Sequence, residues 1–228
     1  MPDEPDRQEL LTALTTEHFT LQGARSRVMT ESASRAALYI SAVSSTLVAL
    51  GFIGQISDVG NTFAVFALTV LPTLYVLGVF TIVRLVECDA EDFLYGLAIN
   101  RIRNYYKQRA GARADLFMLS GHDDARGVFA SMGMPFEGRK PFFGFPTVVA
   151  VINSVVGGSA AAIATGTMAS APLAVAVVVG AAVGVVSLVI LLRLAVRLIT
   201  SRGGGHEALF PSPSSPTPPV SPTPPTSP

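Results

Sequence analysis

The sequence predicts an all-α fold: a four-helix transmembrane protein built as two hairpins, with cytoplasmic helical extensions and a disordered Pro-rich C-terminal tail. Three observations lead to this prediction. Four apolar stretches are each long enough to cross a bilayer core of about 30 Å, which needs roughly 20 residues. Charged residues make up only 14% of the chain, against about 25% in soluble domains, and mean hydropathy is +0.49. Every Lys and Arg lies on one side of the four stretches.

Residues 1–35 are predicted to form an N-terminal cytoplasmic helix. Leu14, Leu21 and Val28 recur every seven residues and form a thin apolar stripe, which suits packing against another helix in the same chain or in a neighbouring subunit. A basic segment followed by a short apolar core is missing here, so we expect no cleavable secretory signal and expect the first span to direct its own insertion.

The first predicted hairpin covers 36–86, with spans at 36–56 and 62–86. The first span carries no charged residue, and Arg84 near the end of the second is the only charge in that span. Pro72 lies inside the second span, where its missing N–H frees a carbonyl and its ring disfavours a straight helix. We therefore predict a kink at Pro72.

The segment 87–142 is predicted to be a helix followed by an irregular loop. Acidic residues begin the helix and basic residues crowd its end near residue 109, as the helix dipole favours. One face combines aromatic, apolar and basic residues and is a candidate surface for a protein partner or for lipid headgroups, unless it packs on residues 6–35. The residues of this face are Tyr95, Arg101, Ile102, Arg103, Tyr105, Tyr106 and Lys107.

The second predicted hairpin covers 143–199, with spans at 143–168 and 172–199. Small residues recur on both spans, and in lipid such residues let helix backbones approach closely. We expect these two spans to pack tightly, with each other or across an oligomer interface. The predicted packing residues are Gly157, Gly158, Ala176, Gly180 and Gly184.

Residues 200–228 are predicted to be a disordered Pro/Ser/Thr-rich tail. The last 18 residues alternate proline with serine and threonine, and prolines this dense remove backbone donors and fix φ. A solvated tail is the simplest interpretation, with binding to a polyproline-reading domain or phosphorylation as alternatives.

The distribution of basic residues predicts the orientation. Four lie before the first span, nine lie between Arg84 and Lys140, and three lie from Arg193 onward, which accounts for all sixteen. Because cytoplasmic loops retain Lys and Arg, both termini and the middle segment are expected in the cytoplasm. Fourteen arginines against two lysines are typical of a GC-rich bacterial genome, which indicates the bacterial inner (plasma) membrane.

Residues able to carry out chemistry are scarce. The three histidines are far apart, Cys88 is the only cysteine, and no Asp, Glu, His or Lys lies in the core of a predicted span. His122, Asp123 and Asp124 could form a metal or acid/base site, but an ordinary polar surface loop explains them more readily. We therefore expect no enzyme, no cofactor, no metal site and no nucleic-acid partner, and the basic residues are explained by topology.

Four short segments carry a resemblance to a family. Residues 17–19 (EHF), 39–45 (YISAVSS) and 48–52 (VALGF), with the later 101–106 (RIRNYY), are similar to a group of uncharacterised actinobacterial multi-pass membrane proteins. The resemblance covers roughly residues 10–110 and implies a membrane fold but no activity. The layout also resembles oligomeric bacterial defence effectors with helical hairpins in the inner membrane.

Three functions are compatible with these features. The first is a structural or partner-binding membrane component that acts through its cytoplasmic helices. The second is an oligomeric pore lined by hydroxyl and amide groups. The third, a membrane-embedded enzyme, is the weakest. The expected partners are the lipid bilayer, with a homo-oligomer and a protein at the cytoplasmic helices left open.

Overall fold

The computed structural model describes residues 7–55, 60–134, 144–202 and 207–213. The described residues are all-α, as predicted, with five α-helices and one short 3-10 helix. In chain order these are α1 (Arg7–Gln55), α2 (Gly60–Ala110), η1 (Gly111–Leu116), α3 (Ala125–Ser131), α4 (Phe145–Met168) and α5 (Leu173–Arg202).

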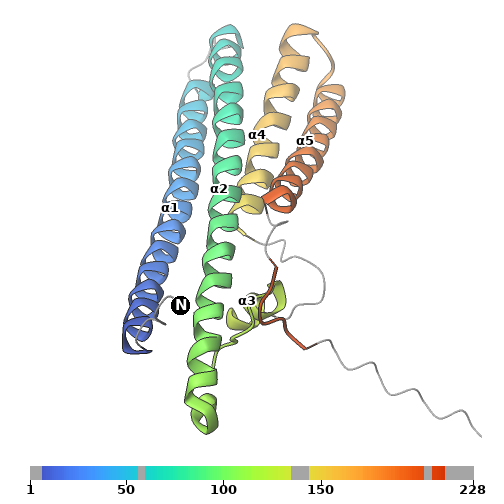
Figure 1. The fold of residues 1–228 in the computed structure, drawn as a ribbon. Coiled ribbons are helices and arrows are strands. Elements are labelled where there is room, and N and C mark those ends of the chain that lie inside the picture. The colour runs from blue at the N-terminus through green and yellow to red at the C-terminus, as the bar shows by residue number, and fades with distance from the viewer. Residues whose placement is uncertain (1–6, 56–59, 135–143, 203–206, 214–228) are drawn as a thin grey trace, which may run out of the picture.

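The four long helices pack as two hairpins, α1 with α2 and α4 with α5. Helix α2 lies at the centre and contacts α1, α4 and α5. The turn between α4 and α5 lies at the same end of the molecule as the end of α1 and the start of α2 (Figure 1). All four helices are long and apolar enough to cross a membrane. Helices α4 and α5 have nearly the bounds predicted for the last two spans, whereas α1 begins well before the predicted span 36–56 and α2 continues well beyond the predicted span 62–86.

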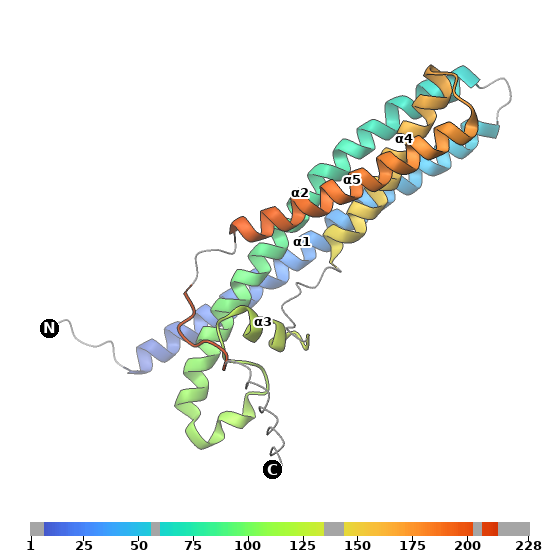
Figure 2. The same cartoon turned by 90° about the vertical axis from the view of Figure 1, so that its right-hand side faces the viewer.

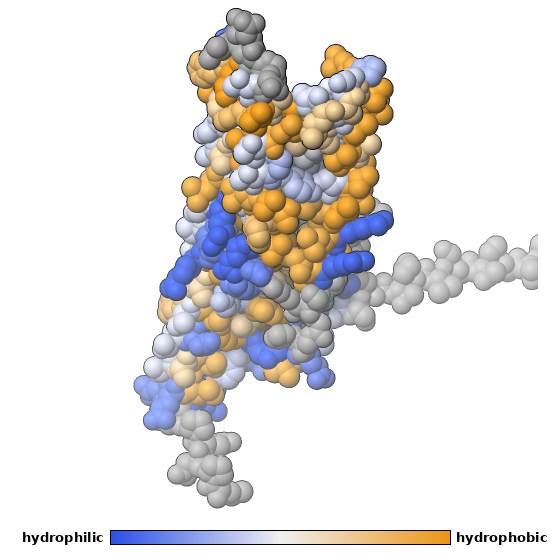
Figure 3. Space-filling model, turned by 90° about the horizontal axis from the view of Figure 1, so that it is seen from above, coloured by the Kyte–Doolittle hydropathy of each residue, from blue (hydrophilic) through white to orange (hydrophobic). Residues whose placement is uncertain are grey.

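Helix length separates a membrane part from a stalk. At 1.5 Å per residue, the 24 residues of α4 reach about 36 Å, which matches a bilayer, whereas the 49 residues of α1 reach about 74 Å. We call the surplus, residues 7–35 of α1 and 87–110 of α2, the stalk (Figure 2). Figure 3 shows the hydrophobic surface at one end and strongly hydrophilic residues from its border into the stalk.

One face of α1 is buried along most of its length. Leu14 and Leu21 are partly buried and Val28 is buried, and the same face continues into the membrane part through Tyr39 and Val43. Buried residues recur every three or four positions along this face, the spacing of one face of a helix: they are Val28, Ser32, Ala36, Tyr39 and Val43. The stripe predicted from the sequence therefore packs within the chain, mainly against α2.

Two predictions about the backbone have different outcomes. Helix α2 continues on both sides of Pro72, and the kink stays a prediction. The prediction that all of 200–228 is disordered is wrong for two parts. Helix α5 extends to Arg202, and residues 207–213 lie against the segment that precedes α3 (Figure 2). Carboxylates there accept hydrogen bonds from the N–H groups of Phe210, before Pro211, and of Ser212, between Pro211 and Pro213. Residues 214–228 lie outside the described residues.

Candidate functional site

A buried polar contact joins three helices inside the membrane part. The hydroxyl of Tyr39 on α1 donates to Oδ1 of Asn153 on α4 at 2.9 Å. The Nδ2 of Asn153 donates to the backbone carbonyl of Tyr75 on α2 at 3.2 Å. Asn153 is 0% and Tyr39 is 2% exposed. Because an unpaired amide in a lipid-like interior is costly, these partners are needed to keep Asn153 there.

The helices are shaped around this contact. Gly78 on α2 leaves the space that Asn153 fills, since a Cβ on Gly78 would lie 2.2 Å from Asn153 Oδ1. Gly157 on α4 makes room for the ring of Tyr75, which would lie 2.8 Å from an added Cβ. The hydroxyl of Tyr75 in turn shares a 2.8 Å hydrogen bond with Ser187 on α5. The network therefore touches all four spans.

This network is built to hold helices together rather than to move charge. Its described members are two phenols, an amide and a hydroxyl, and each hydrogen bond between membrane helices contributes on the order of 0.6 to 1.7 kcal/mol. Asn153 is a strongly polar residue within the predicted span 143–168, but the sequence does not reveal Tyr39 and Tyr75 as its partners. Tyr75 lies in the middle of the apolar span 62–86, and a tyrosine at such a position is a signal that could have suggested a polar partner there.

The glycines of α4 and α5 bring the two backbones together. A Cβ on Gly158 would lie 2.7 Å from the carbonyl oxygen of Gly180, and a Cβ on Gly180 would lie 2.7 Å from Cβ of Ala162. Gly184 faces the carbonyl of Ser154, 3.2 Å from an added Cβ. Three of the predicted packing residues thus meet within one chain.

The two other predicted packing residues play smaller parts in this contact. Gly157 faces Tyr75 of α2 instead of α5. Ala176 is 5% exposed and lies opposite Gly166, whose added Cβ would be at an ordinary 3.8 Å from Cβ of Ala176. The close approach is therefore concentrated at Gly158, Gly180 and Gly184.

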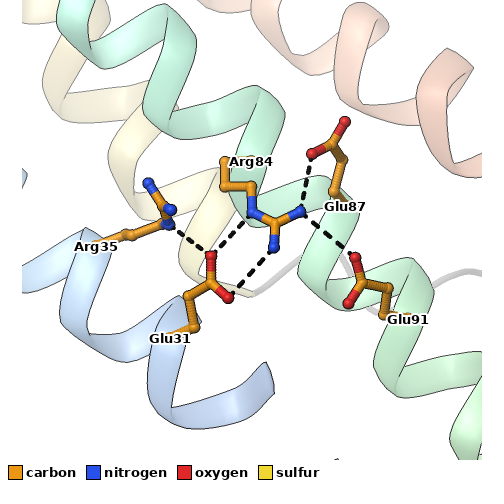
Figure 4. Close-up of polar contacts among 5 residues, drawn as sticks. All are labelled: Glu31, Arg35, Arg84, Glu87 and Glu91. Carbon is orange, nitrogen blue, oxygen red and sulfur yellow. Dashed lines mark hydrogen bonds and ion pairs between the residues drawn. The ribbon is translucent and has the colours of Figure 1, made fainter. Parts of the chain in front are cut away.

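A charged cluster lies where the membrane part meets the stalk (Figure 4). Arg84 of α2 binds both carboxylate oxygens of Glu31 of α1, at 2.9 and 3.2 Å. Its remaining terminal nitrogen contacts Glu87 at 3.1 Å and Glu91 at 3.4 Å, and Arg35 also pairs with Glu31 at 2.8 Å. The only charge in the predicted second span is thus neutralised by several acids, and the cluster joins α1 to α2.

The same border contains two carboxyl groups with opposite shifts. Hydrogen bonds from Arg84 and Arg35 lower the pKa of Glu31 to about 2. Burial, followed by repulsion from Asp92, raises the pKa of Asp89 to about 6. Asp92 itself is bound by Arg25 of α1 at 2.7 and 3.1 Å. The pairs Glu31–Arg84 and Arg25–Asp92 could not be read from sequence, because each joins residues of two different helices.

The predicted partner or lipid face is largely occupied by contacts within the chain. Tyr106 lies against α1, with its ring 5.9 Å from that of His18 and its hydroxyl 3.4 Å from Oγ1 of Thr15. Ile102 is only 7% exposed. Tyr95, Tyr105 and Lys107 are partly buried, and Arg101 and Arg103 bind the segment before α3. For Tyr106 the structure therefore matches the alternative of packing on residues 6–35, while Arg101 and Arg103 contact residues 120–123.

Among the residues that the structure describes, no three His, Cys, Asp or Glu side chains are grouped so as to hold a metal ion. Comparison with known proteins finds no matching family model, no similar curated protein and no similar solved structure.

Proposed function

We propose that this chain is a multi-pass protein of the bacterial inner membrane that serves as a structural or partner-binding component through its stalk, not as an enzyme. Its stalk and both termini face the cytoplasm in this proposal. The uneven distribution of Lys and Arg supports that orientation. Fusion of the C-terminus to a fluorescent protein that matures only in the cytoplasm should give signal, whereas an active periplasmic phosphatase fusion there would contradict the orientation.

The observation that carries the partner-binding role is a set of three exposed apolar side chains toward the far end of the stalk. Leu116 is 82% exposed, Met118 is 90% exposed and Phe19 of α1 is 67% exposed. We call these three residues the tip patch. A large apolar side chain left in water forgoes roughly 1.5 to 3 kcal/mol relative to burial, and methionine and aromatic residues are enriched where proteins bind each other.

An aromatic chain holds the tip patch in place. Phe117 stacks on Tyr106 with ring centroids 6.5 Å apart, and His18 contacts the rings of both Tyr106 and Phe19, at 5.9 and 6.4 Å. The patch is therefore supported by both stalk helices. A surface held in one shape loses less entropy on binding than a mobile one.

Affinity purification from native membranes tests this role. A partner should co-purify with the wild-type chain and be lost from the double variant Leu116→Ser/Met118→Ser. The matched control is Leu173→Ser, which alters an equally exposed leucine (81%) at the opposite end and should retain the partner. A wild-type chain that purifies as a lone monomer would refute the proposal.

An oligomeric pore is the second candidate, and a different observation favours it. One exposed face of α1 in the membrane part carries small or polar residues at three- and four-residue spacing, interrupted only by Val48. Small residues promote helix association in lipid, and hydroxyls and amides can line a pore. These exposed residues are Ala37, Ser41, Ser44, Gly51 and Gln55.

A pore would need several copies, because the interior of the described bundle is filled by fully buried side chains such as Tyr39, Ile82 and Val149. Planar-bilayer recording of the purified chain should then show conductance, and Ser44→Leu should abolish it together with the oligomer. Leu38→Ala, on another exposed face of α1, is the control. Absence of current at all voltages would remove this candidate.

A further inference from the structure

Residues 207–213, with the sequence EALFPSP, run beside the segment 121–124 and the start of α3 (Figures 1 and 2). Asp123 binds the first half of this segment. Its two carboxylate oxygens accept from the backbone N–H of Phe210 at 2.7 Å and of Leu209 at 3.1 Å. The backbone N–H of Asp123 donates back to the carbonyl of Phe210 at 3.2 Å.

Asp124 receives the second half. Its Oδ2 accepts from the backbone N–H of Ser212 at 2.6 Å, and its Oδ1 accepts from the hydroxyl of the same serine at 2.8 Å. Arg126 of α3 donates to the carbonyl of Pro213 at 2.9 Å. Two consecutive aspartates therefore accept hydrogen bonds from the N–H groups of an extended segment, and an arginine donates to the last described carbonyl of that segment.

The carboxylates are positioned by contacts that do not involve residues 207–213. Nε of Arg101 on α2 binds Asp123 at 2.6 Å, and the backbone N–H of Gly127 donates to Asp124 at 2.7 Å. Burial acts to raise the pKa of both aspartates, but hydrogen bonds outweigh it and lower each pKa. Both groups are accordingly charged acceptors at neutral pH.

The backbone around them is also fixed from α2. Asn100, 2% exposed, donates to the carbonyl of His122 at 2.9 Å and accepts from Arg103 at 2.6 Å. Gly127 packs so closely that an added Cβ would lie 2.1 Å from the His122 carbonyl oxygen. The receptor segment thus has one shape, which lowers the entropy lost on binding a peptide.

The bound segment is recognised mainly through its backbone. Leu209 is 62% exposed, so its side chain adds little. Pro211 and Pro213 flank Ser212, and proline has no N–H and a fixed φ. From residue 209 to 213 the chain therefore has N–H groups only at Leu209, Phe210 and Ser212, which are the three that the aspartates accept from, and its extended form is partly set in advance.

We propose that Arg101, Asp123, Asp124 and Arg126 form a peptide-binding site for extended segments that contain Pro-Ser-Pro, which this chain's own residues 207–213 occupy reversibly. Few contacts and little apolar burial make the bond weak for a free peptide. Only residues 203–206 separate the segment from α5, and so short a connection gives a high effective concentration. Occupancy by the chain itself thus blocks the site against other peptides.

Full-length chains test the site by fluorescence anisotropy with a labelled synthetic peptide of residues 207–213. The double variant Phe210→Pro/Ser212→Pro removes two backbone donors and the serine hydroxyl from the chain's own segment, and leaves the receptor residues untouched. The peptide should bind this variant at least tenfold more tightly than it binds the wild-type chain. Adding Asp124→Asn should lower that binding at least tenfold, whereas adding Asp115→Asn, at an exposed aspartate, should leave it unchanged.

Hydrogen–deuterium exchange gives a readout that needs no added peptide. The double-proline variant keeps only the amide of Leu209 among the three. In the wild-type chain the amides of Leu209, Phe210 and Ser212 should each exchange at least tenfold more slowly than the Leu209 amide of that variant. Leu209→Ala, which keeps the backbone donor, should preserve the protection. Unprotected amides in the wild-type chain, or equal peptide binding by wild-type and double-proline chains, would overturn the proposal even if the receptor variants failed to fold.

Discussion

The contact between α4 and α5 provides a graded test of the structure. Replacing glycine by alanine adds the same methyl group at each position, but the space differs. The closest atom to the added Cβ would lie at 2.7 Å for Gly158, 2.7 Å for Gly180, 3.2 Å for Gly184 and 3.8 Å for Gly166. The four substitutions should therefore differ in cost although their chemistry is identical.

The magnitude follows from how far the helices must separate. At Gly158 the obstacle is backbone, the Gly180 carbonyl oxygen, so rotation of a side chain cannot relieve it. Restoring an ordinary contact of 3.4 Å from 2.7 Å needs a shift of about 0.7 Å. Overpacking of this kind costs about 1 to 3 kcal/mol, and gaps of 0.5 to 1 Å forfeit about a quarter to a half of each dispersion contact along the seam.

Cys88 supplies the assay. It is the only cysteine and is 1% exposed, so a thiol-reactive dye should report unfolding in detergent as the temperature rises. For a chain of this size each kcal/mol shifts Tm by about 2 to 4 °C. Gly158→Ala and Gly180→Ala should lower Tm most, Gly184→Ala less, and Gly166→Ala, the internal control, not at all. Equal Tm values for Gly158→Ala and Gly166→Ala would refute the close backbone contact.

Three further predictions concern polar residues. Asn153→Leu should destabilise the bundle by about 1 to 2 kcal/mol, because it removes two interhelical hydrogen bonds of the usual strength in membranes; the dye assay with Cys88 measures it. Glu31 has a lowered pKa, so its contribution to the free energy of unfolding should be complete above pH 4.5, the ordinary pKa, and be lost as pH falls through about 2. Glu31→Gln should reduce this loss of Tm at low pH, the acid limb of the melting curve, in thermal melts followed by circular dichroism. Asp89 has a raised pKa, so the stability that its protonated form contributes is fully present below pH 3.8, its ordinary pKa, and should be lost as pH rises through about 6. Asp89→Asn should remove that loss in the same melts.

Each of these has a matched control. Ser187→Ala removes a single hydrogen bond of the same network and should cost less than Asn153→Leu. Glu9→Gln, at an exposed glutamate of α1, should leave the acid limb of the melting curve intact. Asp115→Asn should not alter the melting curve between pH 4 and 6. An acid limb unchanged by Glu31→Gln would contradict the role assigned to the Glu31–Arg84 pair.

Sequence patterns were sufficient for local features, because those depend on residues close together in the chain. The apolar stretches predict the four spans, since a bilayer imposes a length on any helix that crosses it. The seven-residue stripe through Leu14, Leu21 and Val28 correctly predicts the packing face of α1. The candidate site was less accessible, since its pairs join distant positions, such as Tyr39 with Asn153 and Glu31 with Arg84.

The sequence by itself determined that this protein has four apolar spans with all basic residues at one end, because hydropathy and charge act residue by residue. Only the tertiary structure decided which residues meet. It showed that Tyr106 and Arg101, for which the sequence left a partner, lipid or internal contact open, make contacts within the chain. It also placed residues 207–213, a segment that composition alone predicts to be disordered, on Asp123 and Asp124. The physical reason is that hydrogen bonds and close packing are short-ranged in space and carry no mark in the sequence when their partners lie on different helices.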